Sequence, residues 1–303
     1  MARSTFHPAV HGWLVLDKPL GLTSTQALGR VRRLLGGNKA GHGGTLDPLA
    51  TGILPLAFGE ATKLIPYIME GDKEYEFVVR WGETRTTDDA EGDVTARSEI
   101  RPTPPQIEEA LSSFIGTIAQ RPPSFSAIKV QGERAYDLAR AGEHVELQAR
   151  EVIIKTLKLL TVQDRDHAAF KVTSGKGMYV RSLARDLALK LGTYGYVSAL
   201  RRTKVGPFNI ENAVSITTLE SLSNENARKS LLLPLKTALG PFPTLQLTEN
   251  EAHILRLGQK ILIRPQHSNL LGQSVVFAEQ QGVPVALIEA IAGEFKVLRG
   301  FHF

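Results

Sequence analysis

The chain has 303 residues, 42% hydrophobic and 22% charged, and its 36 Lys and Arg against 31 Asp and Glu give a net charge of +5. This composition is typical of a globular protein with a sizeable core, and it excludes collagen-like and wholly disordered chains. The absence of cysteine excludes disulfides, thiolate nucleophiles and Cys-ligated metal sites. No apolar run approaches the roughly 18–20 residues of a membrane span, so we expect a cytoplasmic protein.

The first expected elements are a strand, a helix and a long loop. Residues 13–17 form a short apolar run that predicts a buried strand. Thr23 and Gln26 have the spacing of a capping box, and the apolar stripe that continues to residue 35 predicts a helix. Residues 36–52 contain six glycines and an Asp-Pro pair, so we expect a loop there.

The middle of the chain alternates between strands and helices. Residues 75–81 place aromatic and aliphatic side chains on one face of a strand, and a helix is expected over about 103–116. Residues 121–145 have no sustained period, so we interpret them as a long and mostly exposed excursion. Further strands are expected at about 152–163 and 169–174.

The last third predicts one more helix, a linker and a small, mostly β domain. The helix, at about 179–191, places Arg181 and Arg185 one turn apart on a single face. Prolines between 234 and 243 indicate the linker, and a capped helix follows at about 248–258. The tail predicts short strands near 260–264, 274–279, 283–289 and 295–299.

The common catalytic signatures are missing. The sequence has no P-loop, no G-x-G-x-x-G after a strand, no H-E-x-x-H and no G-x-S-x-G, and its eight histidines are scattered, so no metal site is predicted. The densest constellation is the glycine-rich stretch 41–52, in which Asp47 precedes a proline and follows a basic segment. From composition alone, Asp47 is either a turn residue or a catalytic carboxylate.

Other positions also stay open on pattern alone. Tyr75 shares a strand face with apolar residues, as a core tyrosine would, and Arg181 is either a solvated helical arginine or part of a site. Arg201 and Arg202 begin a short basic run, which is typical of an exposed face.

Seven segments, in this order and spacing, closely resemble bacterial tRNA pseudouridine synthases of the TruB type. The segments are 12–19 (GWLVLDKP), 43–52 (GGTLDPLATG), 73–75 (KEY), 122–129 (PPSFSAIK), 174–187, 200–203 (LRRT) and 205–208 (VGPF). The tail is similar, more loosely, to the small PUA-like RNA-binding domain of that family.

The resemblance implies an α+β fold. A mixed, largely antiparallel central sheet flanked by helices and loops, the pseudouridine synthase fold, would be followed by a small C-terminal β-rich PUA-like domain. The catalytic domain would occupy residues 1–240, with an RNA-clamping insertion at about 121–145, and the RNA-binding domain residues 245–303.

The resemblance also implies the reaction. Uridine 55 in the T loop of tRNA would be isomerised to pseudouridine, by base flipping and an aspartate-dependent break and re-formation of the glycosidic bond. Neither a metal nor an organic cofactor is expected. The partner would be the tRNA T stem-loop, with no membrane and no protein partner required, and we expect a monomer.

The family pattern assigns roles to five residues. Asp47 is the catalytic carboxylate, and it either attacks covalently or abstracts a sugar proton. Arg181 would pair with Asp47 and orient it, while Tyr75 would stack on the uracil and handle the C5 proton. Tyr179 and Leu200 would wall the pocket and exclude water.

Further residues would bind the RNA. His42 would insert where stacking is lost when the target base leaves the loop. Lys129, Arg134 and Arg140 of the insertion would contact phosphates. The other cations expected along the RNA backbone are Lys18, Lys63, Arg201 and Arg202.

Three rival interpretations remain. A uridine-directed RNA methyltransferase would need a glycine fingerprint for its cofactor, which the sequence lacks. A chaperone that folds tRNA would share the binding surfaces and differ only in not depending on Asp47. A guide-RNA-dependent relative would use partner proteins in place of its own clamp, and the insertion at 121–145 argues against it.

Overall fold

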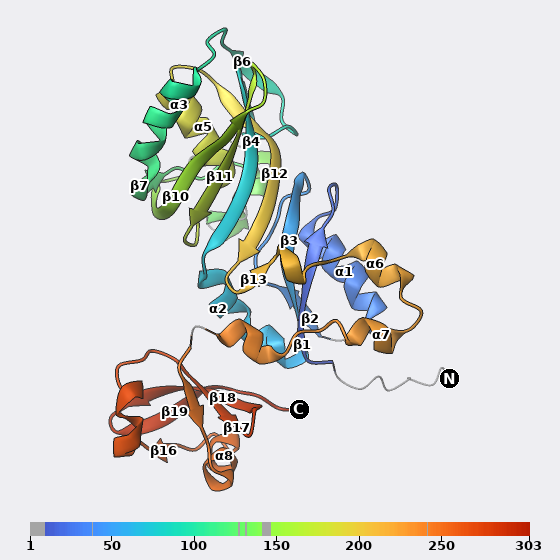
Figure 1. Ribbon diagram of the computed structural model, residues 1–303, viewed down its shortest axis with the longest axis vertical. Helices are drawn as coiled ribbons and strands as arrows, with labels where there is room; N and C mark the ends of the chain where they lie inside the picture. Colours follow the sequence, from blue (N-terminus) through green and yellow to red (C-terminus); the bar gives the residue numbers. More distant parts are fainter. Residues whose placement is uncertain (1–9, 38, 127, 131, 141–146, 241) are drawn as a thin grey trace.

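The structure, a computed structural model, describes residues 10–37, 39–126, 128–130, 132–140, 147–240 and 242–303. A long central sheet with helices beside it is followed by a second, smaller sheet built from the C-terminal residues (Figure 1). Among the described residues, no helix has both the length and the apolarity to cross a membrane.

Within the described residues, the central sheet has ten strands. In spatial order its main path is β14 (Val214–Ser215), β1 (Gly12–Lys18), β3 (Ala50–Phe58), β12 (Gly195–Val205), β4 (Lys73–Trp81), β11 (His167–Ser174), β10 (Arg150–Val162) and β7 (Gly116–Gln120). Off this path, β2 (Ala40–His42) pairs with β3 and β13 (Phe208–Asn209) with β12. The β1–β14 and β3–β12 pairs are parallel and the other pairs antiparallel. The predicted α+β fold with a mixed, largely antiparallel sheet is confirmed.

The remaining strands form the C-terminal sheet and two short hairpins. The C-terminal sheet has the order β15 (Thr244–Gln246), β17 (Val276–Gln280), β18 (Val283–Ile291), β19 (Glu294–Gly300) and β16 (Ile261–Leu262). The hairpins are β5 (Glu83–Arg85) with β6 (Val94–Arg97), and β8 (Lys129–Val130) with β9 (Glu133–Arg134).

The helices include the expected ones, with the predicted caps. The α-helices are α1 (Ser24–Leu34), α2 (Ile65–Glu70), α3 (Pro104–Leu111), α4 (Ala135–Arg140), α5 (Val180–Lys190), α6 (Ile216–Ser221), α7 (Glu225–Lys229) and α8 (Glu249–Arg256). The 3₁₀ helices are η1 (Gly59–Leu64), η2 (Ser112–Phe114), η3 (Ile210–Asn212), η4 (Leu235–Leu239) and η5 (Pro265–Leu270). Thr23 and Gln26 form the predicted capping box of α1.

The sequence does not indicate two adjacent strands of the sheet, β3 and β12. β3 begins inside the expected loop 36–52, and β2 lies within it, so the loop expectation is wrong at those residues. Gly52 and Pro55 obscure β3, since neither residue is typical of a strand interior. Register irregularities at 197–199 and 202–204 break the alternation of β12.

The first strand is buried on both of its faces. Trp13 and Val15 pack on one side, while Leu14 and Leu16 pack on the other side with α1 and α6. The cluster around Trp13 also contains Phe277 of the C-terminal sheet. Residues of η4 are buried in the same cluster, so the expected linker packs against the protein and joins the two sheets through a shared core.

Candidate active site

The loop that carries Asp47 is held by hydrogen bonds to its backbone. The Ser24 hydroxyl accepts from the N–H of Leu46 (2.8 Å) and donates to its carbonyl (3.0 Å). The Pro48 carbonyl accepts from the N–H of Gly21 (2.8 Å). These bonds fix the residues on both sides of Asp47, so its carboxylate is presented from a rigid turn.

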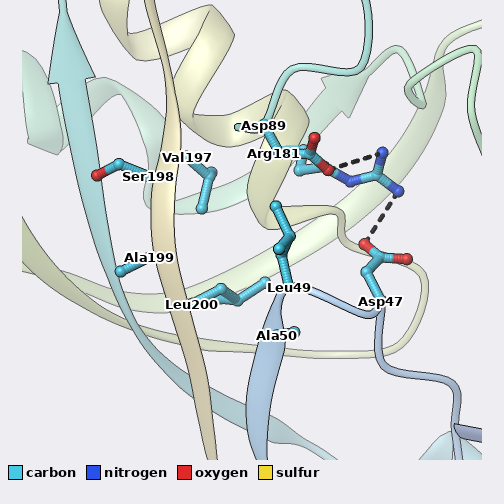
Figure 2. A pocket seen from close by; sticks show the side chains of 9 residues that line it. All are labelled: Asp47, Leu49, Ala50, Asp89, Arg181, Val197, Ser198, Ala199 and Leu200. Atoms are coloured by element: carbon cyan, nitrogen blue, oxygen red, sulfur yellow. Dashed lines mark ion pairs between the residues drawn. The ribbon is translucent and has the colours of Figure 1, made fainter. Parts of the chain in front are cut away.

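Asp47 points toward Arg181 at the start of α5 (Figure 2). Arg181 Nη2 lies 3.1 Å from Asp47 Oδ2, and the two side chains are 8% and 41% exposed. The guanidinium is therefore buried while the carboxylate remains accessible to a ligand. The pairing of these two residues agrees with the role that the resemblance implies for Arg181.

In the described part of the chain, Arg181 has three further partners. Its Nη1 donates to the Thr87 carbonyl (3.0 Å), and its Nη2 donates to the Phe125 carbonyl (2.9 Å). A second carboxylate, Asp89 Oδ2, lies 3.6 Å from Nη1. Asp89 is a site residue that the sequence does not single out, because no motif spacing marks it and only the fold brings its loop to α5.

Arg185 reinforces this arrangement one turn further along α5. Its Nη1 donates to Asp88 Oδ2 (2.9 Å) and its Nη2 to the Arg121 carbonyl (2.8 Å). Burial raises the pKa of Asp88, and the charge of Arg185 opposes that shift. The predicted common face of Arg181 and Arg185 is confirmed, and both arginines fix the loop before Asp89.

A pocket opens beside the ion pair (Figure 2). Its lining residues are Asp47, Leu49, Ala50, Asp89, Arg181, Val197, Ser198, Ala199 and Leu200. Side chains of β3 and β12 make most of the wall apolar, and the charged groups gather at one end. An apolar wall beside an oriented carboxylate can hold a flat ring and keep water from the reacting atoms.

Two tyrosines expected at the site lie outside this lining. Tyr75 is partly buried and packs against the core cluster that contains Phe77 and Phe170. Tyr179 is the N-cap residue of α5. The N–H of Tyr179 donates to Gln120 Oε1 (2.8 Å), and Gln120 Nε2 donates to the Tyr179 carbonyl (3.2 Å). Burial raises the pKa of Tyr179, so its hydroxyl stays protonated at neutral pH.

His42 occupies a partly buried position on β2. Burial lowers the pKa of His42, and the charge of Arg202 lowers it further. A neutral imidazole near the Asp47 loop is therefore expected at pH 7.

Two of the cations expected along the RNA backbone are buried. Lys18 is fully buried, and its Nζ donates to the carbonyls of Pro19 (3.0 Å) and Leu22 (2.8 Å). Burial lowers the pKa of Lys18 to about 8. Arg202 is 2% exposed and also donates to backbone carbonyls. Neither side chain offers an exposed cation to a phosphate, so the expected RNA-backbone role does not fit them.

The other expected cations have different surroundings. Lys63 donates to Glu60 Oε2 (2.6 Å) and to the Gly300 carbonyl (2.7 Å), which ties η1 to the end of the C-terminal sheet. Arg201 pairs with both oxygens of Asp17 (3.1 and 2.8 Å) and is partly exposed. Three cations expected in the insertion have side chains outside the described part of the chain: Lys129, Arg134 and Arg140.

Among the described residues, no three or more His, Asp and Glu side chains come together as a metal ion would require.

Two family models match the chain. The model described as the N-terminal domain of the TruB family of pseudouridylate synthases matches residues 32–180. The model described as the C-terminal domain of tRNA pseudouridylate synthase B matches residues 181–240.

Curated relatives and solved structures agree with these matches. Proteins named tRNA pseudouridine synthase B are similar over the full length: one from Rhodospirillum rubrum is 48% identical (99% of each chain), and one from Caulobacter vibrioides 49% (100% of this chain, 99% of the other). The fold is shared with a solved chain of a Cbf5–Nop10–Gar1 complex, at a TM-score of 0.74 and 24% identity over 96% of this chain and 85% of that one. The chain therefore belongs to the TruB family of pseudouridylate synthases.

Proposed function

We propose that this protein isomerises uridine 55 in the T loop of tRNA to pseudouridine. The family matches support uridine isomerisation, and the names of the full-length relatives support tRNA as the substrate. The observation that carries the proposal is the ion pair between Asp47 and the buried Arg181, at the charged end of an otherwise apolar pocket. A uracil ring matches such a pocket, because its faces are apolar and its sugar can approach the carboxylate.

The proposed chemistry needs only groups that the protein and the substrate supply. The N1–C1′ bond of the uridine breaks, the base turns within the pocket, and C5 joins C1′. The C5 proton then leaves and N1, which carries none in uridine, gains a proton, so substrate and product contain the same atoms. No oxidant, reductant or cofactor takes part in this balance. Asp47 acts on the sugar, either as a nucleophile or as a base, while Arg181 holds it in position.

The walls of the pocket would protect the broken bond. Leu200 and the neighbouring apolar side chains exclude the water that would otherwise hydrolyse the intermediate. We assign Tyr179 to the same wall and Tyr75 to stacking on the uracil, with its hydroxyl as the group that receives the C5 proton.

The uridine must leave the stacked loop before it can enter the pocket, at a cost of a few kcal/mol. We assign His42 to the vacated stacking position, because an imidazole kept neutral by burial adds no charge that must be desolvated among the bases. Arg201 and the cations of the 121–145 insertion are assigned to phosphates. RNA is commonly recognised by loop shape and backbone in this way.

The C-terminal sheet completes the proposal. We assign residues 245–303 to a PUA-like RNA-binding domain and residues 1–240 to the catalytic domain. A cytoplasmic monomer that acts on tRNA without a protein partner is part of the same proposal.

An unmodified tRNA transcript with tritium at C5 of its uridines tests the proposal. The purified protein, without cofactor or partner, is expected to release tritium from the wild-type transcript. A transcript with cytidine at position 55 is the matched control and should release none. Equal release from both transcripts would refute position 55 as the target. Tight binding without any release would favour the tRNA-folding chaperone instead.

A further inference from the structure

Arg202 lies in the middle of the central sheet. It sits on β12 opposite Gly52 of β3 on one side and opposite Tyr75 of β4 on the other. A Cβ atom on Gly52 would lie 2.2 Å from the Arg202 carbonyl oxygen and 2.9 Å from its backbone nitrogen. The backbone of Arg202 is therefore packed tightly against β3, which leads directly out of the Asp47 loop.

The guanidinium of Arg202 binds three backbone carbonyls around Asp47. Its Nη2 donates to Gly44 (3.0 Å) and its Nη1 to Thr45 (3.2 Å), both just before Asp47. Its Nε donates to Ile53 (2.8 Å), within the strand that follows the loop. A single side chain thus bonds the loop before Asp47 and the strand after it.

These acceptors are carbonyls, so the positive charge of Arg202 is buried without neutralisation by them. Burial lowers the pKa of the Arg202 guanidinium, and its interactions with the Tyr75 hydroxyl and the Asp47 carboxylate oppose this shift. A buried cation costs several kcal/mol unless its surroundings compensate for the lost water. A residue that only filled space at this position would be apolar, so the forked donor at position 202 indicates a specific use.

We propose that Arg202 is a positioning residue, which fixes the Asp47 loop and the side chain of Tyr75 relative to each other in the pseudouridine synthase reaction. This inference rests on the proposed function, in which Asp47 acts on the sugar and Tyr75 receives the C5 proton. Both groups must address one nucleotide, and a displacement of about 1 Å can cost about a hundredfold in rate. Arg202 bonds the backbone before and after Asp47 and interacts with the Tyr75 hydroxyl, and it is itself too deeply buried to touch RNA phosphates.

Arg202→Lys and Arg202→Met test the inference by separating rate from affinity. The single-turnover rate on saturating tRNA is expected to fall at least about tenfold in both variants, because one lysine nitrogen cannot occupy the positions of Nε, Nη1 and Nη2 together and methionine has no N–H donor. The Kd for tRNA should stay within about threefold of the wild-type value, since the RNA-facing surface is unchanged.

Arg228 provides the matched control. It donates to the carbonyls of Leu219 (2.8 Å) and Leu222 (2.7 Å) near α7, with no residue of the pocket among these partners. Arg228→Met should lower the melting temperature and leave the single-turnover rate unchanged.

Two results would overturn the inference. One is a single-turnover rate within about twofold of wild type in folded Arg202→Lys. The other is a loss of affinity as large as the loss of rate, which would make Arg202 a binding residue. If Arg202→Met does not fold, the Arg202→Lys result decides. An inactive wild-type protein would instead contradict the proposed function, and this would be seen before any variant is compared.

Discussion

The buried guanidinium of Arg181 holds the half-exposed carboxylate of Asp47, and the two residues come from the start of α5 and from the loop between β2 and β3. The same guanidinium also faces Asp89 and two backbone carbonyls. Because the buried partner is fixed on every side, it can orient the exposed partner. The catalytic geometry thus depends on contacts that are far apart in the chain.

Arg181→Lys is expected to lower turnover by about a hundredfold in a folded protein. A lysine keeps the charge, but one ammonium cannot reach Asp47 and the Thr87 and Phe125 carbonyls together. Single-turnover assays on tRNA measure the effect. The control, Arg228→Lys, should keep the wild-type rate. Near-normal turnover by Arg181→Lys would remove the ion pair from the mechanism.

Gly52→Ala is expected to destabilise the protein by about 3 kcal/mol or more. The added methyl would lie 2.2 Å from the Arg202 carbonyl oxygen, at a residue whose φ is +99°. Gly29→Ala is the control. Gly29 lies inside α1 with open space around the added methyl, so this change should stabilise by about 0.5–1 kcal/mol. Urea unfolding measures the free energy of unfolding of both variants, and equal changes in that energy would contradict the close approach of β3 and β12.

Lys18→Met is expected to change how stability depends on pH. The pKa of Lys18 is lowered from 10.5 to about 8 in the folded protein, mainly by burial. Between these values the unfolded chain binds more protons than the folded one, so this group makes stability rise with pH. The stability gained through this group is complete above pH 10.5 and is lost as the pH falls to about 8.

Urea unfolding across that pH window measures the slope. Lys18→Met should remove a rise on the order of 1 kcal/mol per pH unit. Lys190→Met, at the exposed end of α5, is the control and should leave the slope as in wild type. Parallel pH profiles for wild type and Lys18→Met would contradict the burial of the ammonium.

Arg201→Gln is expected to weaken the salt dependence of tRNA binding. If Arg201 contacts one phosphate, the slope of log affinity against log salt should shrink by about 0.7–0.9. Lys190→Gln is the control, because Lys190 lies at the far end of α5, about 15 Å from the pocket end of that helix. An unchanged slope for Arg201→Gln would exclude Arg201 from the phosphate contacts.

Helices and strands that are stabilised by contacts between nearby residues could be predicted from local sequence patterns. The capping box of Thr23 and Gln26, and the apolar stripe of the helix that carries Arg181, are visible in the sequence because their partners lie within a few residues. The strand with Tyr75 is equally visible, since its alternation matches the buried face of the sheet.

Contacts between distant segments could not be predicted in this way. In the sequence, Arg202 belongs to a basic run that is typical of an exposed face, yet in the fold its guanidinium bonds the carbonyls just before Asp47. Asp89 faces Arg181 only because a separate loop folds over α5. Lys18 belongs to a recognisable segment, but its burial depends on the turn that closes over it.

In the proposed reaction, Asp47 acts on the nucleotide and does not serve only to bind it. Tritium release from C5-labelled tRNA, measured together with Kd for wild type and Asp47→Asn, tests this claim most directly. We expect that Asp47→Asn releases no tritium and binds tRNA within a few-fold of wild type, because asparagine keeps the shape but cannot act as nucleophile or base. Release at the wild-type rate, or a loss of affinity that accounts for the lost release, would contradict it.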